Sequence, residues 1–208
     1  EGLTDFAKFL KIPCVGGKVS FYNETPSGPI KPTPLIGVLG ITNKAPLHPT
    51  PPVSGDYLII IGKTKDELGG SEYFEYIHDF IGGTCPTVDF KNSKSNMSSV
   101  LSLIKKNLVK SVHDCSKGGL STALAEMSIF GEIGCNIDIG KLPKEGNIDF
   151  EKLLFSETHS RYLLTVTQKN INKVKSILSN KKNSFNVLGR FTSDQIIITY
   201  KSKCLVKI

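Results

Sequence analysis

The nine residues from 112 to 120, Val-His-Asp-Cys-Ser-Lys-Gly-Gly-Leu, constrain the fold most, because they join two kinds of secondary structure within a few positions. Residues 108–112 are largely apolar and β-prone, which predicts a strand that ends at this loop. The apolar residues that follow recur at the spacing of one helix face: Leu120, Ala123, Leu124 and Met127. The stretch therefore predicts a strand, a polar glycine-rich loop and a helix that Gly131 ends.

Two interpretations of this loop remain open from its residues. Gly118 and Gly119 allow a close approach of the backbone, and amides at a helix N-terminus favour an anion such as phosphate. His113 and Asp114 would place an imidazole and a carboxylate at the same edge. The structural alternative is a tight strand-to-helix turn in which an Asp or Ser side chain caps the helix.

Composition limits the class of protein. The 208 residues are 39% hydrophobic and 22% charged, which is typical of a globular protein. The net charge of +7 suits an anionic ligand, but the lysines are scattered and no stripe of aromatic and basic residues accompanies them, which argues against nucleic acid. No apolar run approaches the roughly 20 residues that span a bilayer, and no signal peptide is recognisable, so we expect no membrane partner.

The five cysteines are odd in number and form no C-x-x-C pair. Free thiols in a reducing cytoplasm are the expectation. Cys115 lies inside the central loop, but no neighbouring feature would activate it, so we expect a buried neutral thiol rather than a nucleophile.

The first 52 residues look unlike a complete domain. A short helix is predicted over 4–10, and strands are predicted at 18–21 and 35–41. Side chains of Lys18 and Ser20 share one parity and would emerge together, either as a phosphate-binding pair or as an ordinary exposed strand face. Prolines crowd residues 44–53, which predicts a linker. The segment before the linker is too short to bury a core alone, so we expect residues 1–52 to be the tail of an α+β N-terminal domain, plus linker. The first residue, Glu1 rather than Met, fits a piece of a longer protein.

Residues 53–208 alternate between strand and helix patterns. Strands are predicted at 57–62, 134–139, 162–166, 185–191, 195–200 and 203–208. Helices are predicted at 73–81, 149–155 and 169–178. A further helix is predicted to begin at a cap residue, Ser95 or Asn96, and to end at Leu108, with Leu101 facing inward. This order fits an α+β domain, a layered α/β/α arrangement with a mixed sheet.

A third polar stretch precedes the strand predicted at 162–166. Glu157 and Arg161 flank a turn there. The two side chains could hold a ligand between them, or they could form a mutual ion pair that fixes the turn.

Five segments, taken together and in order, resemble one family, the synthetase subunit of phosphoribosylformylglycinamidine synthase. The five are 16–24 (GGKVSFYNE), 32–37 (PTPLIG), 68–73 (LGGSEY), 113–120 (HDCSKGGL) and 154–162 (LFSETHSRY). The family consists of two homologous halves, and these segments resemble the second half. The resemblance implies the end of the second N-terminal domain, followed by the whole final C-terminal domain at 53–208.

The resemblance also implies an activity. Enzymes of this family amidate formylglycinamide ribonucleotide with ammonia that a glutaminase subunit supplies. The synthetase subunit works in a complex with this glutaminase subunit and a small accessory subunit. ATP activates the amide oxygen, and Mg²⁺ neutralises the triphosphate. Gly17 falls where the family approaches ATP, and Ser20 where it contacts substrate. The family's acid–base histidines belong to the first half, so the fragment alone, without the rest of its chain, is expected to be inactive.

Lys18 departs from the family, which has a metal-ligating Asn there. An ammonium group cannot ligate Mg²⁺, so no metal ligand is expected in this chain. A non-catalytic scaffold or subunit-docking domain with a degenerate nucleotide site is therefore one alternative. Another ATP-dependent member of the wider aminoimidazole-ribonucleotide-synthetase-like superfamily is a second.

Overall fold

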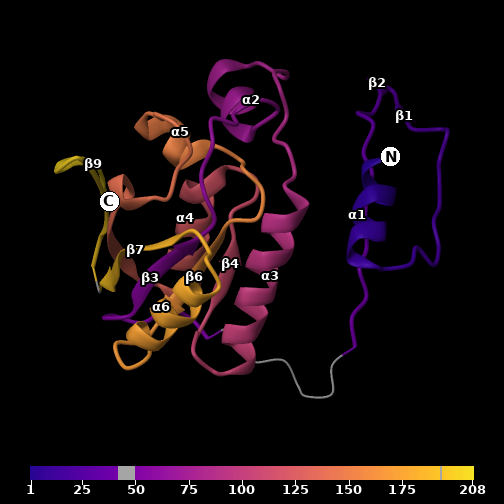
Figure 1. The fold of residues 1–208 in the computed structure, drawn as a ribbon. Coiled ribbons are helices and arrows are strands. Elements are labelled where there is room, and N and C mark those ends of the chain that lie inside the picture. Colours follow the sequence, from indigo (N-terminus) through magenta and orange to yellow (C-terminus); the bar gives the residue numbers. More distant parts are fainter. Residues whose placement is uncertain (42–49, 193) are drawn as a thin grey trace. The chain divides into compact units, whose positions relative to one another are not determined.

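A computed structural model describes residues 1–41, 50–192 and 194–208 (Figure 1). The chain divides into two compact units, Glu1–Leu47 and His48–Ile208. Most of the predicted proline-rich linker, residues 44–49, lies outside the described residues. None of the helices in the described ranges has the length and apolar character needed to cross a membrane.

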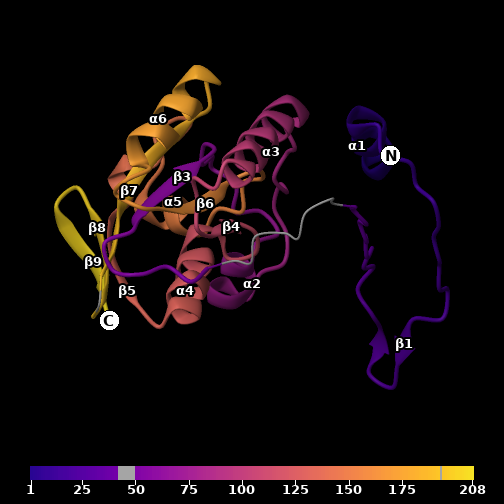
Figure 2. The ribbon, with the colours of Figure 1, turned by 90° about the horizontal axis from the view of Figure 1, so that it is seen from below.

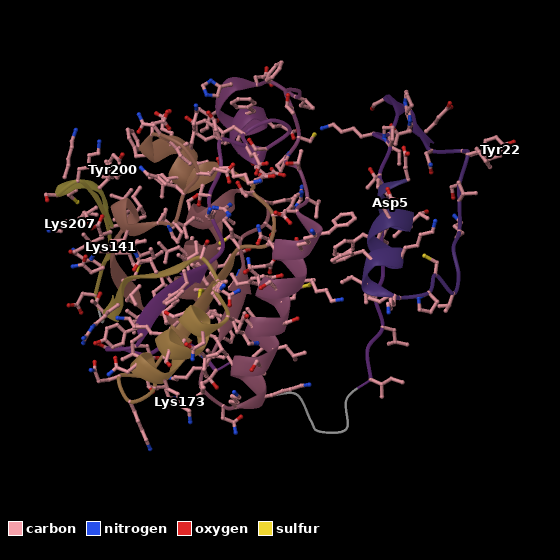
Figure 3. The ribbon with its side chains drawn as sticks, viewed as in Figure 1. Asp5, Tyr22, Lys141, Lys173, Tyr200 and Lys207 are labelled. Carbon is pink, nitrogen blue, oxygen red and sulfur yellow. The ribbon has the colours of Figure 1, made fainter. Side chains whose placement is uncertain are left out.

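The N-terminal unit has little regular structure. Helix α1 spans Gly2–Leu10, which confirms the predicted helix, and β1 (Glu24–Thr25) pairs with β2 (Gly28–Pro29). The strands predicted at 18–21 and 35–41 are wrong for this structure, because both segments are irregular there. A strand needs neighbours to satisfy its backbone, and an isolated hairpin is only marginally stable. Tyr22 projects outward with 98% of its surface exposed (Figure 3).

The C-terminal unit is built on one seven-stranded sheet. Its strands are β3 (Tyr57–Ile61), β4 (Val112–Asp114), β5 (Gly134–Asp138), β6 (Tyr162–Val166), β7 (Phe185–Thr192), β8 (Ile196–Tyr200) and β9 (Lys203–Lys207). The spatial order is β4-β6-β3-β7-β5-β8-β9. The β5–β8 pair is parallel and the other pairs are antiparallel, which confirms the predicted mixed sheet.

Helices cover both faces of this sheet, which confirms the layered α/β/α arrangement (Figure 2). The helical segments are α2 (Glu72–His78), α3 (Phe90–Lys105), α4 (Gly119–Gly131), the 3₁₀ turn Ile139–Lys141, α5 (Phe150–Phe155) and α6 (Ile171–Asn180). One apolar cluster lies between the sheet and the helices α4 and α5. The other lies between the sheet and the helices α3 and α6.

The central strand β3 shows why its sequence is an unbroken apolar run. Leu58 and Ile60 point into the cluster with α4, whereas Ile59 and Ile61 point into the cluster with α3. All four side chains are fully buried. A strand buried on both faces has no solvent face and therefore no polar alternation.

Three predicted boundaries are wrong. Helix α3 begins at Phe90 with Asp89 as its cap, so Asn96 lies inside the helix, and Leu101 is 50% exposed rather than inward. The strand before the central loop begins at Val112 instead of residue 108, because Leu108 still closes the end of α3 through its bond to the carbonyl of Leu103. Helix α2 ends at His78, where the backbone of Asp79 turns left-handed with φ 47°.

Candidate functional site

The central loop connects the edge strand β4 to the start of helix α4. Gly118 is the N-cap of α4, and no side chain at the cap position bonds the first turn. The cap predicted from a neighbouring Asp or Ser is therefore wrong. The N–H of Gly118 instead donates to the Oε1 atom of Glu157 at 2.8 Å, from a turn distant in sequence.

Glu157 joins two helix N-termini through one carboxylate. Its Oε1 atom also accepts a hydrogen bond from the N–H of Glu72, the first residue of α2, at 2.9 Å. Helix N-termini carry partial positive charge, so a carboxylate is favourable at both. Lys117 adds a third link, since its Nζ atom lies 2.7 Å from the Oε1 atom of Glu72.

The two glycines of the loop serve close packing. Both have left-handed backbone, with φ +70° at Gly118 and +65° at Gly119. A Cβ atom on Gly119 would lie 2.5 Å from the carbonyl oxygen of Ser156. The start of α4 therefore fits against the 154–157 turn only because this residue lacks a side chain.

Arg161 is fully buried and holds the same turn from inside. Its guanidinium donates to the carbonyl oxygens of Thr158, at 3.0 Å, and of Ser156, and to the hydroxyl of Thr64 at 3.1 Å. Burial lowers the pKa of this guanidinium. The mutual ion pair offered for Glu157 and Arg161 is wrong, because each side chain binds other partners.

The remaining loop residues have distinct roles. Cys115 is buried, and burial raises the pKa of its thiol to about 11, which leaves it protonated near neutral pH. The Nδ1 atom of His113 lies 2.7 Å from the carbonyl oxygen of Asp114, and its Nε2 atom lies 3.2 Å from a carboxylate oxygen of Glu126. The side chain of Asp114 is exposed at the end of β4.

A pocket of about 300 Å³ opens beside the loop. Its lining includes Asp114, Ser116, Lys117, Glu157 and Tyr162. Burial, and then the charge of Asp114, raise the pKa of the Tyr162 hydroxyl. A second polar pocket of about 110 Å³ shares His159 and Ser160 with the first.

The structure brings some of the predicted site residues together and separates others. Gly118, Gly119, Glu157 and Arg161 meet around the 154–157 turn. Gly17, Lys18 and Ser20 lie in the other unit, where the ammonium of Lys18 donates to the hydroxyl of Ser20. Sequence reasoning missed Glu72 as a partner of the loop. Its position in the LGGSEY segment, two residues after a glycine pair, was the available signal.

A mixed seven-stranded sheet between two helical layers, with a glycine-rich loop at one edge, defines a layered α+β domain. The family described as AIR synthase related protein, C-terminal domain, matches residues 53–201, and the chain belongs to this family.

Longer relatives resemble the chain along nearly all of its length. It is 41% identical over 207 residues to the phosphoribosylformylglycinamidine synthase subunit PurL of Thermococcus sibiricus, covering 98% of this chain and 28% of that protein. It is 40% identical over 218 residues to PurL of Methanocaldococcus jannaschii, covering 100% of this chain and 29% of that protein. The chain therefore spans less than a third of the curated relatives it matches.

Solved structures share the fold. T. maritima PurL complexed with FGAR aligns with a TM-score of 0.69 and 16% identity, over 76% of this chain and 28% of that one. The same protein complexed with ATP aligns with a TM-score of 0.65 and 16% identity, over 76% of this chain and 25% of that one. The hydrogenase maturation protein HypE of E. coli aligns with a TM-score of 0.55 and 15% identity, over 75% of this chain and 49% of that one.

Proposed function

We propose that this chain is the C-terminal part of an ATP-dependent carbon–nitrogen ligase of de novo purine biosynthesis. The whole protein would convert formylglycinamide ribonucleotide, glutamine-derived ammonia and ATP to formylglycinamidine ribonucleotide, ADP and phosphate. The observation that carries this proposal is the 41% identity to a PurL subunit along 98% of the chain. Residues 1–52 would be the tail of a preceding domain with its linker, and 53–208 the final domain.

Exposed apolar residues support this division of the chain. Val15, Leu35 and Leu39 are each more than 90% exposed, and no residue of α1 is buried. So much exposed apolar surface is typical of a segment that packs against another part of a protein. We assign that role to the rest of the same domain.

Two residues of the N-terminal unit would contact the ligands. Gly17 is exposed, and a Cβ atom on it would meet nothing within 4 Å, so its backbone is open to ATP. Ser20 would contact the ribonucleotide through its hydroxyl. ATP supplies the phosphoryl group that activates the amide oxygen. What these residues contribute is orientation of the two reactants.

Mg²⁺ would accompany the triphosphate, but position 18 does not fit a metal ligand. The Lys18 ammonium is a donor only, and it already donates to Ser20. Position 18 therefore supplies no metal ligand, and any Mg²⁺ would be held by groups elsewhere.

The expected partners follow from the same assignment. One related structure is described as PurLQS from Thermotoga maritima. By analogy we propose a glutaminase subunit and a small accessory subunit as partners here, and no nucleic acid. All five cysteines, each within the described ranges, are free thiols, which favours the reducing cytoplasm.

The test is an assay of the full-length protein that contains this chain. Purified protein is mixed with ATP, Mg²⁺, ammonium and formylglycinamide ribonucleotide, and ADP release is measured. We expect release that depends on both ammonium and the ribonucleotide, and none from the 208-residue chain alone. Release from the full-length protein that ignores the ribonucleotide would contradict the proposal.

Lys18 supports a second candidate, a scaffold or docking domain with a degenerate nucleotide site. The substitution Lys18→Asn in the full-length protein separates the two. If position 18 still belongs to a working nucleotide site, the variant changes the dependence of activity on Mg²⁺. An unchanged dependence favours the scaffold.

A further inference from the structure

Positive charge is concentrated in residues 162–208. This stretch holds nine Lys and Arg residues and a single acidic residue, Asp194, which gives it a net charge of +8. The whole chain has a net charge of +7, so residues 1–161 are close to neutral. An asymmetry of this kind indicates a surface that attracts an anionic partner.

Part of this charge lies on an open face of the sheet. A row of directly paired residues crosses five strands from β3 to β9, and its members in order are Tyr57, Arg190, Asn136, Ile197 and Lys207. Residues that lie opposite one another in neighbouring strands point to the same face. Only Tyr57 belongs to the apolar cluster with α3 and α6, and the other three polar side chains are exposed. At this row the face is therefore open from β7 to β9.

Arg190 is held in place on this face. Its guanidinium lies 4.0 Å from the centre of the Tyr57 ring, and its Nη2 atom donates to the Tyr57 hydroxyl and to the Oε1 atom of Gln168 at 3.3 Å. The Tyr57 hydroxyl donates to the same Gln168 oxygen at 2.6 Å. The N–H groups on the Nε and Nη1 atoms take no part in these bonds. A stacked guanidinium with donors to spare is pre-organised to bind a carboxylate.

Helix α6 continues the charge beside this face. The bond between Arg190 and Gln168 brings the next residue, Lys169, close to the sheet, and Lys173 and Lys175 are exposed on α6 itself (Figure 3). Within the described ranges, none of the basic residues from 169 to 207 forms an ion pair, whereas lysines elsewhere in the C-terminal unit do.

The nearest carboxylates along the sheet are already bound. The Oδ1 atom of Asp138 on β5 accepts from the N–H of Gly140 at 2.9 Å, and its Oδ2 atom lies 3.8 Å from the Nζ atom of Lys141. Asp56, before β3, is buried and lies 2.7 Å from the Nζ atom of Lys110. Neither carboxylate neutralises the cations of this surface.

We propose that five residues form a basic face that docks an acidic surface of a partner protein: Lys169, Lys173, Lys175, Arg190 and Lys207. None of the five lines either of the two pockets, so they do not converge on one small anion. Cations spread over a helix and a sheet match several carboxylates on an extended surface. This inference rests on the C-terminal unit and not on the proposed ligase activity.

Other occupants fit this basic face less well. Between residues 162 and 207, no large apolar side chain is exposed in the part that the structure describes, so the face has no anchor for a membrane. Arg190 covers the Tyr57 ring, which leaves that ring unable to stack on a nucleic-acid base. A second copy of the chain would present the same charge, and like charges repel.

The test uses the full-length protein that contains this chain and a fluorescein-labelled peptide of alternating Glu and Ser residues. Binding is measured by fluorescence anisotropy at increasing salt concentration. We expect saturable binding at low salt that weakens as salt is added, because exposed charges are screened. Absence of binding at low salt, or binding that salt does not weaken, would overturn the proposal.

A triple variant locates the binding on the basic face. Lys169→Gln, Lys173→Gln and Lys175→Gln together should weaken binding of the peptide roughly 3- to 100-fold, the sum of three exposed ion pairs. Arg at the same three positions keeps the charge and should keep the affinity. All these variants should keep the melting temperature nearly unchanged, since surface substitutions alter stability little.

The matched control removes the same charge elsewhere. Lys8→Gln, Lys91→Gln and Lys144→Gln together change three exposed lysines outside the basic face, and the affinity should change far less. Equal losses in the two triple variants would overturn the proposal, because the peptide would then report net charge alone.

An oligouridine RNA tests the other class of anionic partner. We expect no binding of this RNA at physiological salt. Saturable binding under those conditions that the basic-face variant abolishes would overturn the proposal in favour of a nucleic acid. None of these readouts involves catalysis, so their failure and the failure of the ligase assay are distinguishable.

Discussion

The side-chain amide of Asn96 donates a hydrogen bond to the carbonyl oxygen of Ser160 at 3.0 Å, across 64 positions of the sequence. The same amide group accepts from the Nδ2 atom of Asn183 at 2.9 Å, and Asn183 accepts from the hydroxyl of Ser99 at 2.7 Å. This chain of bonds ties α3 to the turn before β6 and to the loop before β7. The polar start of α3 is therefore an internal contact surface.

Substitution of Asn96 tests this network. Asn96→Ala should destabilise the chain by about 1–3 kcal/mol, because buried partners are left unsatisfied. Asn96→Ser should be nearly as costly, since Ser can cap a helix but cannot reach both partners. Asp89→Ser, at the true N-cap of α3, should be tolerated. Urea denaturation of the three variants decides the matter, and a stable Asn96→Ser variant would contradict the network.

Arg161 is the largest fully buried side chain in the described structure. Arg161→Ala leaves a cavity and three oxygens without their donor, so we expect a loss of at least about 3 kcal/mol. Arg161→Lys should rescue little, because one ammonium cannot reproduce the planar fork. Lys173→Ala, on the exposed face of α6 (Figure 3), is the control and should change the stability by less than about 0.5 kcal/mol.

The sequence predicts those features of the fold that are determined by local patterns of residues. The run at 57–61 predicts a buried strand, because a short, unbroken run of large apolar residues is typical of a strand that is buried on both faces. Asn96 shows the limit: a polar residue near a helix start has the same local pattern whether it caps the helix or faces an internal network. The Glu157–Gly118 bond is beyond local reasoning, since it depends on how the turn before β6 and the start of α4 come together in the fold.

Two glycines with positive φ make a matched pair. Gly146 has φ +79° and open space around it, so Gly146→Ala should cost about 1–2 kcal/mol from backbone strain alone. Gly119→Ala adds a clash 2.5 Å from the Ser156 oxygen, which should raise the cost by about 1–3 kcal/mol more. Thermal denaturation of both variants measures the difference, and equal losses would mean that the close packing contributes nothing.

The reactivity of the five cysteines toward a thiol reagent should follow their burial. Cys14, Cys85 and Cys204 are exposed, whereas Cys115 and Cys135 are buried. In the folded chain a thiol reagent should therefore modify three cysteines quickly, and the other two only on unfolding. Reaction of all five at one rate would contradict the buried placement.

Burial raises the pKa of the Cys115 thiol from its ordinary value of 9.0 to about 11. Between these pH values the unfolded chain releases a proton that the folded chain keeps, so the contribution to stability is present below pH 9 and is lost as the pH rises toward 11. Cys115→Ala should flatten this alkaline loss, as measured by urea denaturation at several pH values. An alkaline slope that is unchanged in the variant would contradict the assignment.

The proposal that this chain is part of a purine-synthesising ligase is tested most directly by the growth of a bacterial strain without purine. The gene for the full-length protein that contains this chain is expressed in a bacterial strain that lacks its own synthetase subunit, together with the glutaminase and accessory subunits from the same source. We predict growth without added purine, and loss of that growth when residues 53–208 are deleted. Failure to grow, with all subunits produced in folded form and a known PurL system restoring growth in parallel, would contradict the account.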